Sequence, residues 1–258
     1  MSFFNNTVER FNGKAVDYAK YRPAYPAEFL DYLFADNEVG LSIGKTVADV
    51  GAGTGIFSAL LAERGAEVLC VEPNEEMRAQ LVATMADLPY KLINARACET
   101  GIEAESVDCV TAAQAFHWFD RKLFRAECAR ILKPHGRVVL VWNTPDDRSR
   151  LMVEQERVRQ TFCGGYVTQD HRDTKDPTKF SDFFRYGACV CRAFRNDRVA
   201  DEETFIGRNL SSSWSPLRGD EQYQPFVDAL HELFEKYQEH GMAELPEITR
   251  CFVGGVEK

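Results

Sequence analysis

The residues of this chain most suited to chemistry form a glycine-rich turn and a nearby acid. In the segment VADVGAGTG (residues 47–55), three glycines at alternate positions follow a strand-like run and precede a helix-like one. Glycine lets the backbone approach a ligand closely, and a helix N-terminus presents free N–H groups. Glu72 lies 17 residues after Gly55, at the end of the next strand-like run. A carboxylate there can accept both hydroxyls of an adenosine ribose, so the pair predicts a nucleoside site.

The spacing of the glycines favours one kind of nucleoside over another. A dinucleotide fold uses G-x-G-x-x-G, but here Ile56 stands where the third dinucleotide glycine would be. This departure counts against NAD. The segment GLSIGKT (residues 40–46) resembles a phosphate-binding loop, but it has one residue too few between its glycines. It also precedes a strand where a phosphate-binding loop must follow one, so we expect a plain turn.

Other catalytic chemistries have little support in the sequence. The histidines at positions 117, 135, 171, 231 and 240 form no H-x-H or H-E-x-x-H pattern, which argues against a metal site. No G-x-S-x-G hydrolase motif occurs. The eight cysteines contain no C-x-x-C, and Cys189 and Cys191 are spaced for one face of a strand. We therefore expect reduced thiols and no metal.

Alternating strand-like and helix-like stretches must position the glycine turn and the acid. Short, continuously apolar runs alternate with helical periodicity, the pattern of a parallel sheet with crossover helices and of strands buried on both faces. Prolines stop a helix in the aromatic segment DYAKYRPAYP (residues 17–26). The expected strands are 46–50, 66–72, 92–95, 107–113, 137–142, 189–194 and 248–253, and the expected helices are 56–64, 75–88, 123–132, 149–162, 201–209 and 226–237.

The length and the residue pattern of the chain favour a single α/β domain that spans residues 1–258. We expect an N-terminal helical cap (1–44), a cofactor-binding core (45–145), an insertion that covers the acceptor side of the sheet (146–187) and a segment that completes the sheet (188–258). The late strands are needed to finish the sheet, so the residues after Asn143 belong to the same domain.

Composition excludes several functional classes. Forty acidic against 31 basic residues give a net charge of −9, which disfavours a phosphate-backbone partner such as nucleic acid. The N-terminus MSFFNNTVER lacks the basic and apolar regions of a signal peptide, and no apolar run approaches the ~20 residues of a membrane span. We expect a cytoplasmic protein that acts on a diffusible small molecule, with no membrane partner and with an oligomeric state that the sequence leaves open.

These motifs resemble the class I S-adenosylmethionine-dependent methyltransferases, in particular the trans-aconitate methyltransferase-like branch of small-molecule enzymes. VADVGAGTG is similar to the first family motif, Glu72-Pro73-Asn74 with Met77 to the second, and residues 107–119 to the fourth-strand motif. RILKPHG (residues 130–136) resembles the turn before strand 5, with His135 where the family more often has glycine. The resemblance covers about the first 145 residues. It implies a Rossmann-like, doubly wound, seven-stranded, mostly parallel sheet whose last strand is antiparallel.

The resemblance also implies a set of contacts with S-adenosylmethionine and its product S-adenosylhomocysteine. The glycine turn would line the methionine and ribose portion, Glu72 would bind the ribose hydroxyls, and the other positions would contact the adenine or lie beneath the sulfonium. An alternative interpretation is that Cys98 lies in this loop without a role in binding. The implied cofactor-binding residues are Gly51, Ala52, Gly53, Gly55, Glu72, Asn74, Met77, Ala97, Cys98, Glu99, Gln114 and Ala115.

Two further stretches match this branch in particular. Tyr18 and Arg22 would cap the site, with Arg22 on the amino-acid carboxylate of the cofactor, or would only pack a lid. His117 and Trp118 would form the floor of the acceptor pocket, with His117 as a base, an orienting donor or a packed ring. Trp214, in the turn SSSWSP (residues 211–216), is the third candidate catalytic residue. Further candidates to hold the acceptor are Arg148, Arg150, His171, Arg172, Ser211 and Ser213.

The leading hypothesis is therefore methyl transfer to a small molecule, with a carboxylate or hydroxyl oxygen as the candidate acceptor atom. In-line displacement from a sulfonium depends mostly on positioning, so a general base is not strictly required. Two alternatives stay open at this point. One is an NAD(P)-dependent oxidoreductase using the same turn and acid, and the other is an S-adenosylmethionine-binding protein without catalysis.

Overall fold

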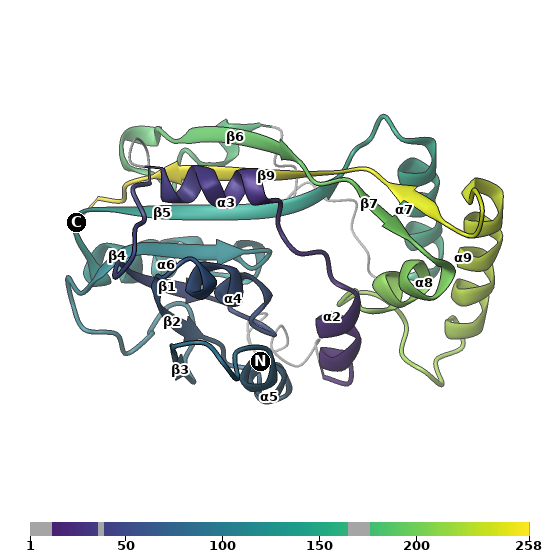
Figure 1. Ribbon diagram of the computed structural model, residues 1–258, viewed down its shortest axis with the longest axis horizontal. Coiled ribbons are helices and arrows are strands. Elements are labelled where there is room, and N and C mark those ends of the chain that lie inside the picture. Colours follow the sequence, from purple (N-terminus) through teal and green to yellow (C-terminus); the bar gives the residue numbers. More distant parts are fainter. Residues whose placement is uncertain (1–11, 36–38, 165–175, 258) are drawn as a thin grey trace.

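The chain is built around one seven-stranded sheet, seen in a computed structural model that describes residues 12–35, 39–164 and 176–257 (Figure 1). The strand order is β3-β2-β1-β4-β5-β9-β6, and β9 pairs antiparallel with both of its neighbours while the other pairs are parallel. This confirms the expected mixed sheet whose last strand is antiparallel. The strands are β1 (Thr46–Val50), β2 (Glu67–Val71), β3 (Tyr90–Ile93), β4 (Val107–Ala113), β5 (Leu132–Pro145), β6 (Val190–Arg195) and β9 (Glu247–Gly254).

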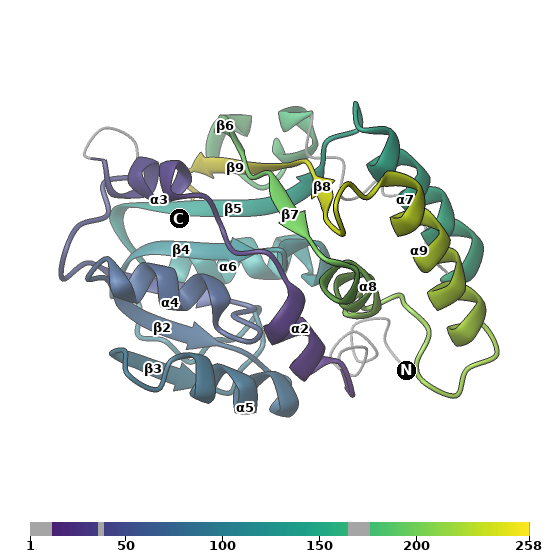
Figure 2. The same ribbon diagram turned by 45° about the vertical axis from the view of Figure 1, so that its right-hand side comes forward.

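Helices cover both faces of the sheet, as the doubly wound prediction requires (Figures 1 and 2). Helices α3 (Ala27–Phe34), α4 (Ile56–Glu63) and α5 (Glu75–Thr84) contribute buried apolar side chains to the core on one face. Helix α6 (Arg121–Ile131) contributes to the core on the opposite face. Because both faces are covered, the central strands are buried on both sides, which explains their continuous apolar character.

A third core forms beyond the carboxyl ends of the parallel strands. Helices α7 (Arg150–Phe162), α8 (Glu202–Leu210) and α9 (Tyr223–Tyr237) pack together there, and Figure 2 shows them beside the sheet instead of on either face. A short antiparallel pair, β7 (Arg198–Ala200) with β8 (Ala243–Leu245), joins this layer to the sheet. The sequence patterns did not predict this pair, because three residues are too few for a periodic signal.

The segment 146–187, expected to lie over the sheet, divides between two places. Its helix α7 packs against α9, beside the sheet and not on either of its faces. The later part, with the short helix η2 (Pro177–Phe180) and with η3 (Arg185–Gly187), does reach the sheet. There Phe180 and Phe183 are buried in the same core as α6. The apolar stripe of α7 alone could not indicate which partner it meets.

Four of the described α-helices begin at a residue whose side chain accepts a backbone hydrogen bond from the first turn. Asn74, Asp120, Ser149 and Asp201 cap α5, α6, α7 and α8 in this way. Such capping stabilises a helix end by about 1 kcal/mol. The cap explains why α6 begins at Arg121, two residues before the predicted start.

Several other boundaries differ from the prediction. Helix α5 ends four residues earlier than expected, at Thr84, and α9 begins three residues earlier, at Tyr223. Strand β3 lies two residues earlier than expected, and β5 is longer at both ends because Leu132 pairs with β4 and the pairing with β9 continues to Pro145. The segment 40–46 is a turn that leads into β1, as predicted.

The N-terminal segment contains two helices with different partners. Helix α2 (Ala15–Tyr21) ends just before Arg22 and Pro23, as the prolines predict, and contacts both α5 and α8 (Figure 2). Lys14 fixes the start of α2, because its Nζ donates to the carbonyl oxygens of Ser212 (2.6 Å) and Ser215 (2.7 Å). Helix α3 packs in the core and does not cap the site. The expected cap is therefore α2.

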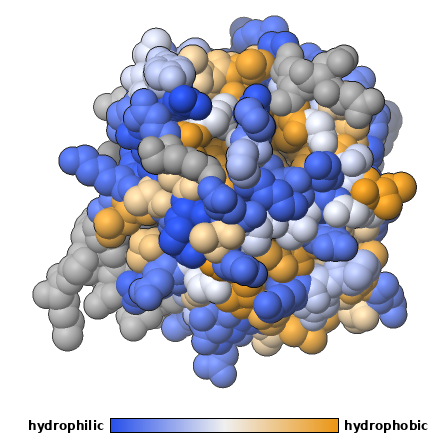
Figure 3. Space-filling model, turned by 90° about the vertical axis from the view of Figure 1, so that its left-hand side faces the viewer, coloured by the Kyte–Doolittle hydropathy of each residue, from blue (hydrophilic) through white to orange (hydrophobic). Residues whose placement is uncertain are grey.

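The surface carries no extended apolar area on the face in Figure 3, where hydrophobic groups are separated by hydrophilic ones. Across residues 12–35, 39–164 and 176–257, no helix is both long and apolar enough to cross a lipid bilayer. The eight cysteines are all free thiols, and Cys70 and Cys109 are fully buried in the strands that they interrupt.

Candidate functional site

The glycine turn after β1 has backbone angles that only glycine adopts easily. Gly51, Gly53 and Gly55 have φ values of 74°, 56° and 83°. A Cβ at Gly51 would lie 2.6 Å from the Ala115 Cβ, whereas a Cβ at Gly53 would meet nothing within 4 Å. Gly51 therefore serves close packing, and Gly53 leaves open space above the backbone.

Gly55 has a packing role that the sequence did not reveal. A Cβ there would lie 3.0 Å from Cγ of Leu81, so this glycine lets α4 begin against α5. It was expected to line the ligand site with the other glycines, but it is not among the residues that form the cavity described below.

Glu72 lies at the carboxyl end of β2, opposite the open side of the glycine turn. Its Oε2 accepts the N–H of Gly53 (2.9 Å), and its Oε1 accepts the N–H of Asn74 (2.8 Å). The residue is 7% exposed, and this burial raises the pKa of its carboxyl group although the two backbone N–H groups and Arg78 act in the opposite direction. Each oxygen retains a lone pair that can accept a further hydroxyl.

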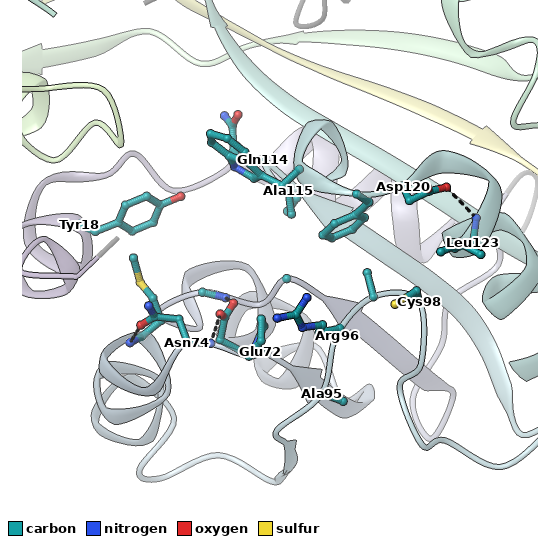
Figure 4. A pocket seen from close by; sticks show the side chains of 18 residues that line it. Tyr18, Glu72, Asn74, Ala95, Arg96, Cys98, Gln114, Ala115, Asp120 and Leu123 are labelled. Carbon is teal, nitrogen blue, oxygen red and sulfur yellow. Dashed lines mark hydrogen bonds between the residues drawn. The ribbon is translucent and has the colours of Figure 1, made fainter. Parts of the chain in front are cut away.

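A cavity of about 290 Å³ opens between the glycine turn, Glu72 and the end of β4 (Figure 4). Figure 4 shows Tyr18 and Gln114 on one side and Glu72 and Asn74 facing them. Most of the predicted ligand residues meet here, from five separate segments of the chain. The predicted residues that line it are Tyr18, Gly51, Gly53, Glu72, Asn74, Met77, Ala97, Cys98, Gln114, Ala115 and Trp118.

Asn74 and Met77 form one wall of the cavity through the start of α5. The Asn74 Oδ1 accepts the N–H of Met77 (2.9 Å), and its Nδ2 donates to Oδ1 of Asn12 (2.8 Å). The cap of α5 thus ties this wall to the N-terminal segment. Glu99, expected beside Ala97 and Cys98, pairs through its backbone with Arg96 and does not line the cavity.

The end of β4 forms the opposite wall. Gln114 has a positive φ of 57°, unusual for a residue other than glycine, and its Nε2 donates to the carbonyl oxygen of Asn143 (3.0 Å). Such backbone strain is often found at functional sites. Ala115 lies beside it, in contact with Gly51.

The three predicted catalytic residues occupy different places. Trp118, in the short helix η1 (Phe116–Trp118), lines the cavity, whereas His117 and Trp214 do not. The His117 ring packs against Trp118 with centroids 4.7 Å apart, and Trp214 stacks on Trp118 at 6.2 Å. Of the three, Trp118 alone lines the cavity, and the other two rings pack on it.

A second, narrow cavity of about 40 Å³ adjoins the first and shares Tyr18, Gly51 and Gln114 with it. Arg22 and Ala52, both predicted ligand residues, line this second cavity. The Arg22 guanidinium lies over the Tyr18 ring, 4.7 Å from its centroid. Burial lowers the pKa of Arg22.

The other acceptor candidates are less suited to the role. Arg148 is exposed and paired with Asp146 (2.6 Å), and Arg150 is exposed. Ser211 donates its hydroxyl to the carbonyl oxygen of Arg208 (2.7 Å). Ser213 is half-buried and lines neither cavity, and His171 and Arg172 lie outside the described residues.

Several lining residues were not predicted from the sequence. They lie at or after the carboxyl ends of β2, β3 and β4, and this place is the signal that could have identified them. The sequence motifs marked only some positions of each loop. The additional residues are Pro73, Ala95, Arg96, Ala113, Phe119, Asp120 and Leu123.

No cluster of histidine, cysteine or acidic side chains in the described part of the chain could hold a metal ion.

A family model described as a methyltransferase domain matches residues 48–140. An uncharacterised methyltransferase from Mycobacterium bovis is 42% identical over 137 residues, which cover 53% of each chain. An uncharacterised methyltransferase-like protein from Schizosaccharomyces pombe is 34% identical over 141 residues, 54% of each chain. The match thus spans about half the length of these curated relatives. The region that the family model matches contains Gly51, Gly53, Gly55, Glu72 and the end of β4.

Solved structures with the same fold extend the similarity over nearly the whole chain. A candidate type II methyltransferase from Anaeromyxobacter dehalogenans has a TM-score of 0.65 at 21% identity, covering 91% of this chain and 98% of its own. A phosphoethanolamine N-methyltransferase from Haemonchus contortus, solved with S-adenosyl-L-methionine, has a TM-score of 0.54 at 15% identity. The alignment covers 61% of that chain and 100% of this one.

Proposed function

Because the chain belongs to the class I S-adenosylmethionine-dependent methyltransferase family, we propose that it transfers a methyl group from S-adenosylmethionine to a small-molecule acceptor. The observation that carries the proposal is Glu72: a buried carboxylate at the end of β2, fixed by two backbone N–H groups and facing the open side of Gly53.

The residues of the cavity fit this cofactor. The carboxylate of Glu72 can accept two ribose hydroxyls, and the space above Gly53 admits a ligand close to the backbone. Met77, Ala97 and Leu123 offer apolar contacts for an adenine ring. Arg22, at the inner end of the adjoining narrow cavity, is placed to meet an amino-acid carboxylate.

When bound, S-adenosylmethionine supplies an electrophilic methyl group on a sulfonium. The protein's part is then to position the acceptor in line and to exclude water, which alone can contribute a large share of the rate. Gln114, Ala115 and Trp118 form the wall where we place the methyl group. His117 is shielded by Trp118, so we assign it to orienting that ring and not to proton transfer.

The acceptor atom that this arrangement suits is an oxygen that is already ionised or weakly acidic, a carboxylate or a hydroxyl. Neither needs a strong base beside the methyl group in the way that a neutral carbon acid would. The second candidate for the chain is a protein that binds the cofactor without transferring its methyl group, and an activity measurement separates the two.

Calorimetric titration with S-adenosylhomocysteine tests the cofactor assignment. Glu72→Gln keeps the shape of the side chain and removes the charge, so we expect its affinity to fall by about 10-fold or more. Glu67→Gln, at the exposed opposite end of the same strand, is the matched control and should bind as the wild type does. Binding of NADH in place of S-adenosylhomocysteine would overturn the assignment.

Transfer itself is tested by release of S-adenosylhomocysteine from S-adenosylmethionine in the presence of a panel of small carboxylates and phenols. Turnover on any member supports the enzyme. Tight cofactor binding without turnover on any compound would favour the non-catalytic alternative.

A further inference from the structure

Four arginine side chains lie around one carboxylate at the junction between the sheet and the layer of helices α7 to α9. Arg22 follows α2, Arg159 is in α7, Arg198 in β7 and Arg208 in α8, and Glu247 begins β9. Arg208 and Glu247 form an ion pair with side chains only 10% and 2% exposed. Figure 2 shows these elements converging beyond the carboxyl ends of β4 and β5. We call these five residues the arginine cluster.

The charges of the arginine cluster do not balance. Arg159 and Arg208 both act to lower the pKa of Arg22, while Glu247 acts to raise it, so the groups are close enough to interact. Arg198 interacts likewise with Arg208 and Glu247, so positive groups outnumber the negative one here, although the whole chain has a net charge of −9. Buried charge of one sign is costly unless an opposite charge offsets it.

Polar atoms in the arginine cluster also lack partners. Among the described residues, the buried Nε atoms of Arg22 and Arg198 and the buried Oε2 of Glu247 have no hydrogen-bond partner. Arg159 donates its Nε–H to Oδ1 of Asn209 (3.0 Å), and within the same part of the chain its terminal nitrogens make no hydrogen bond. Buried donors are normally satisfied, and an anion would supply the acceptor that the Nε–H groups of Arg22 and Arg198 lack.

The arginine cluster is connected to the cofactor cavity by side-chain contacts. Arg22 stacks on Tyr18, which lines the cavity. On the other side, Gln114 donates to Asn143, and both Asn143 and Arg198 donate to the carbonyl oxygen of Ala24. Three hydrogen bonds therefore link Arg198 to Gln114, in the wall where we place the methyl group.

We propose that the arginine cluster is an anion subsite that binds a carboxylate of the methyl acceptor. The proposal rests on the proposed function, because it places the acceptor next to the cofactor cavity. Guanidinium groups match carboxylates in bidentate geometry, and Arg159 on α7 and Arg198 on β7 offer such donors from two elements, while Arg22 meets the carboxylate of the cofactor. The expected substrate is a small organic acid, held by one carboxylate while its reacting atom lies toward Gln114 and Trp118.

The direct test is calorimetry on protein saturated with S-adenosylhomocysteine, with succinate and benzoate as probes and with succinamide and benzamide as their neutral counterparts. We expect at least one acid to bind and its amide to bind at least 10-fold more weakly. Arg159→Gln should weaken binding of the acid by 10-fold or more and leave the affinity for S-adenosylhomocysteine within twofold. Arg159→Lys, which keeps the charge, should lose less affinity for the acid than Arg159→Gln.

Arg157→Gln is the matched control, because Arg157 lies on the same helix but is exposed. Binding of the acid should be unchanged in that variant. Glu247→Gln provides a test of opposite sign, since removing the one negative charge should tighten binding of the acid in a protein whose thermal unfolding shows that it is folded. Equal affinity for acid and amide, or an unchanged affinity in Arg159→Gln, would overturn the proposal while cofactor binding, and with it the proposed function, still stood.

A final arm distinguishes the acceptor's carboxylate from that of the cofactor. 5′-Methylthioadenosine has the nucleoside but no amino-acid carboxylate. If the acid binds when methylthioadenosine fills the site and is displaced by S-adenosylhomocysteine, the arginine cluster serves the cofactor and the proposal is wrong. Binding of the acid together with S-adenosylhomocysteine supports an acceptor subsite.

Discussion

At the scale of single residues, Glu72 has a geometry that suits ligand binding, but its burial lowers the stability of the ligand-free protein. Its carboxylate is desolvated in the fold, and burial raises its pKa above the ordinary value of 4.5. The folded chain therefore holds this proton at pH values where the unfolded chain has released it. Stability from this group is consequently greatest at low pH and declines as the pH rises above 4.5.

Glu72→Gln should accordingly gain stability relative to the wild type as the pH rises, while weakening the cofactor site. We expect the difference in free energy of unfolding, variant minus wild type, to increase between pH 4.5 and pH 7, measured by urea denaturation at several pH values. The difference also contains a constant loss, because the amide has one acceptor oxygen for the two backbone N–H groups that the carboxylate accepts. Glu67→Gln, exposed on the same strand, should show no such trend. A difference that stays constant or falls as the pH rises would contradict this account.

At the scale of elements, the glycines of the turn between β1 and α4 have different structural roles. Gly51 is confined by Ala115 and Phe119, with a would-be Cβ only 2.6 Å and 3.1 Å from their side chains, while the space beside Gly53 is open. The motif predicted a flexible, ligand-facing turn, but only the packing of β4 and α5 around it distinguishes the structural glycines from the one that faces the cavity.

Alanine at each position should separate the two roles. Gly53→Ala should cost the fold only about 1–2 kcal/mol from its positive φ, yet weaken S-adenosylhomocysteine binding because the methyl group enters the ligand's space. Gly51→Ala should lower stability by more than that, because it adds a steric clash to the same backbone strain. Denaturation and calorimetry on both variants check this, and equal losses of stability would refute the division.

At the scale of the whole molecule, the sequence indicated the sheet well and the helical layer poorly. The strands β1 and β4 were predicted at their observed bounds, because they are buried on both faces and lie next to glycine or polar turns. The partner of α7 could not be predicted, since an apolar stripe shows that a helix is covered but not by what. The arginine cluster could not be predicted for the same reason, because its members come from five segments that only the tertiary fold brings together.

The connections between the sheet and the helical layer lead us to propose that they form one domain. Strand β7 follows β6, and β8 leads directly into β9, so the chain crosses between the two parts at several points. The buried pair of Arg208 and Glu247 links α8 to the start of β9. Losing the layer would break this buried ion pair and leave Glu247 without Arg208, which is unfavourable.

A change in the helical core should therefore destabilise the sheet as well. The test variant is Leu230→Ala, at a fully buried position in the core of α7 to α9. It is made in a Trp118→Phe, Trp214→Phe background, so that the fluorescence of Trp142 reports unfolding of the sheet core. We expect a single urea transition whose free energy falls by about 2–5 kcal/mol. Glu235→Ala, exposed on the same helix, should change it by no more than about 0.5 kcal/mol. If Trp142 keeps its original transition while circular dichroism shows an earlier loss of helix, the helical layer unfolds on its own and the chain has two units of folding.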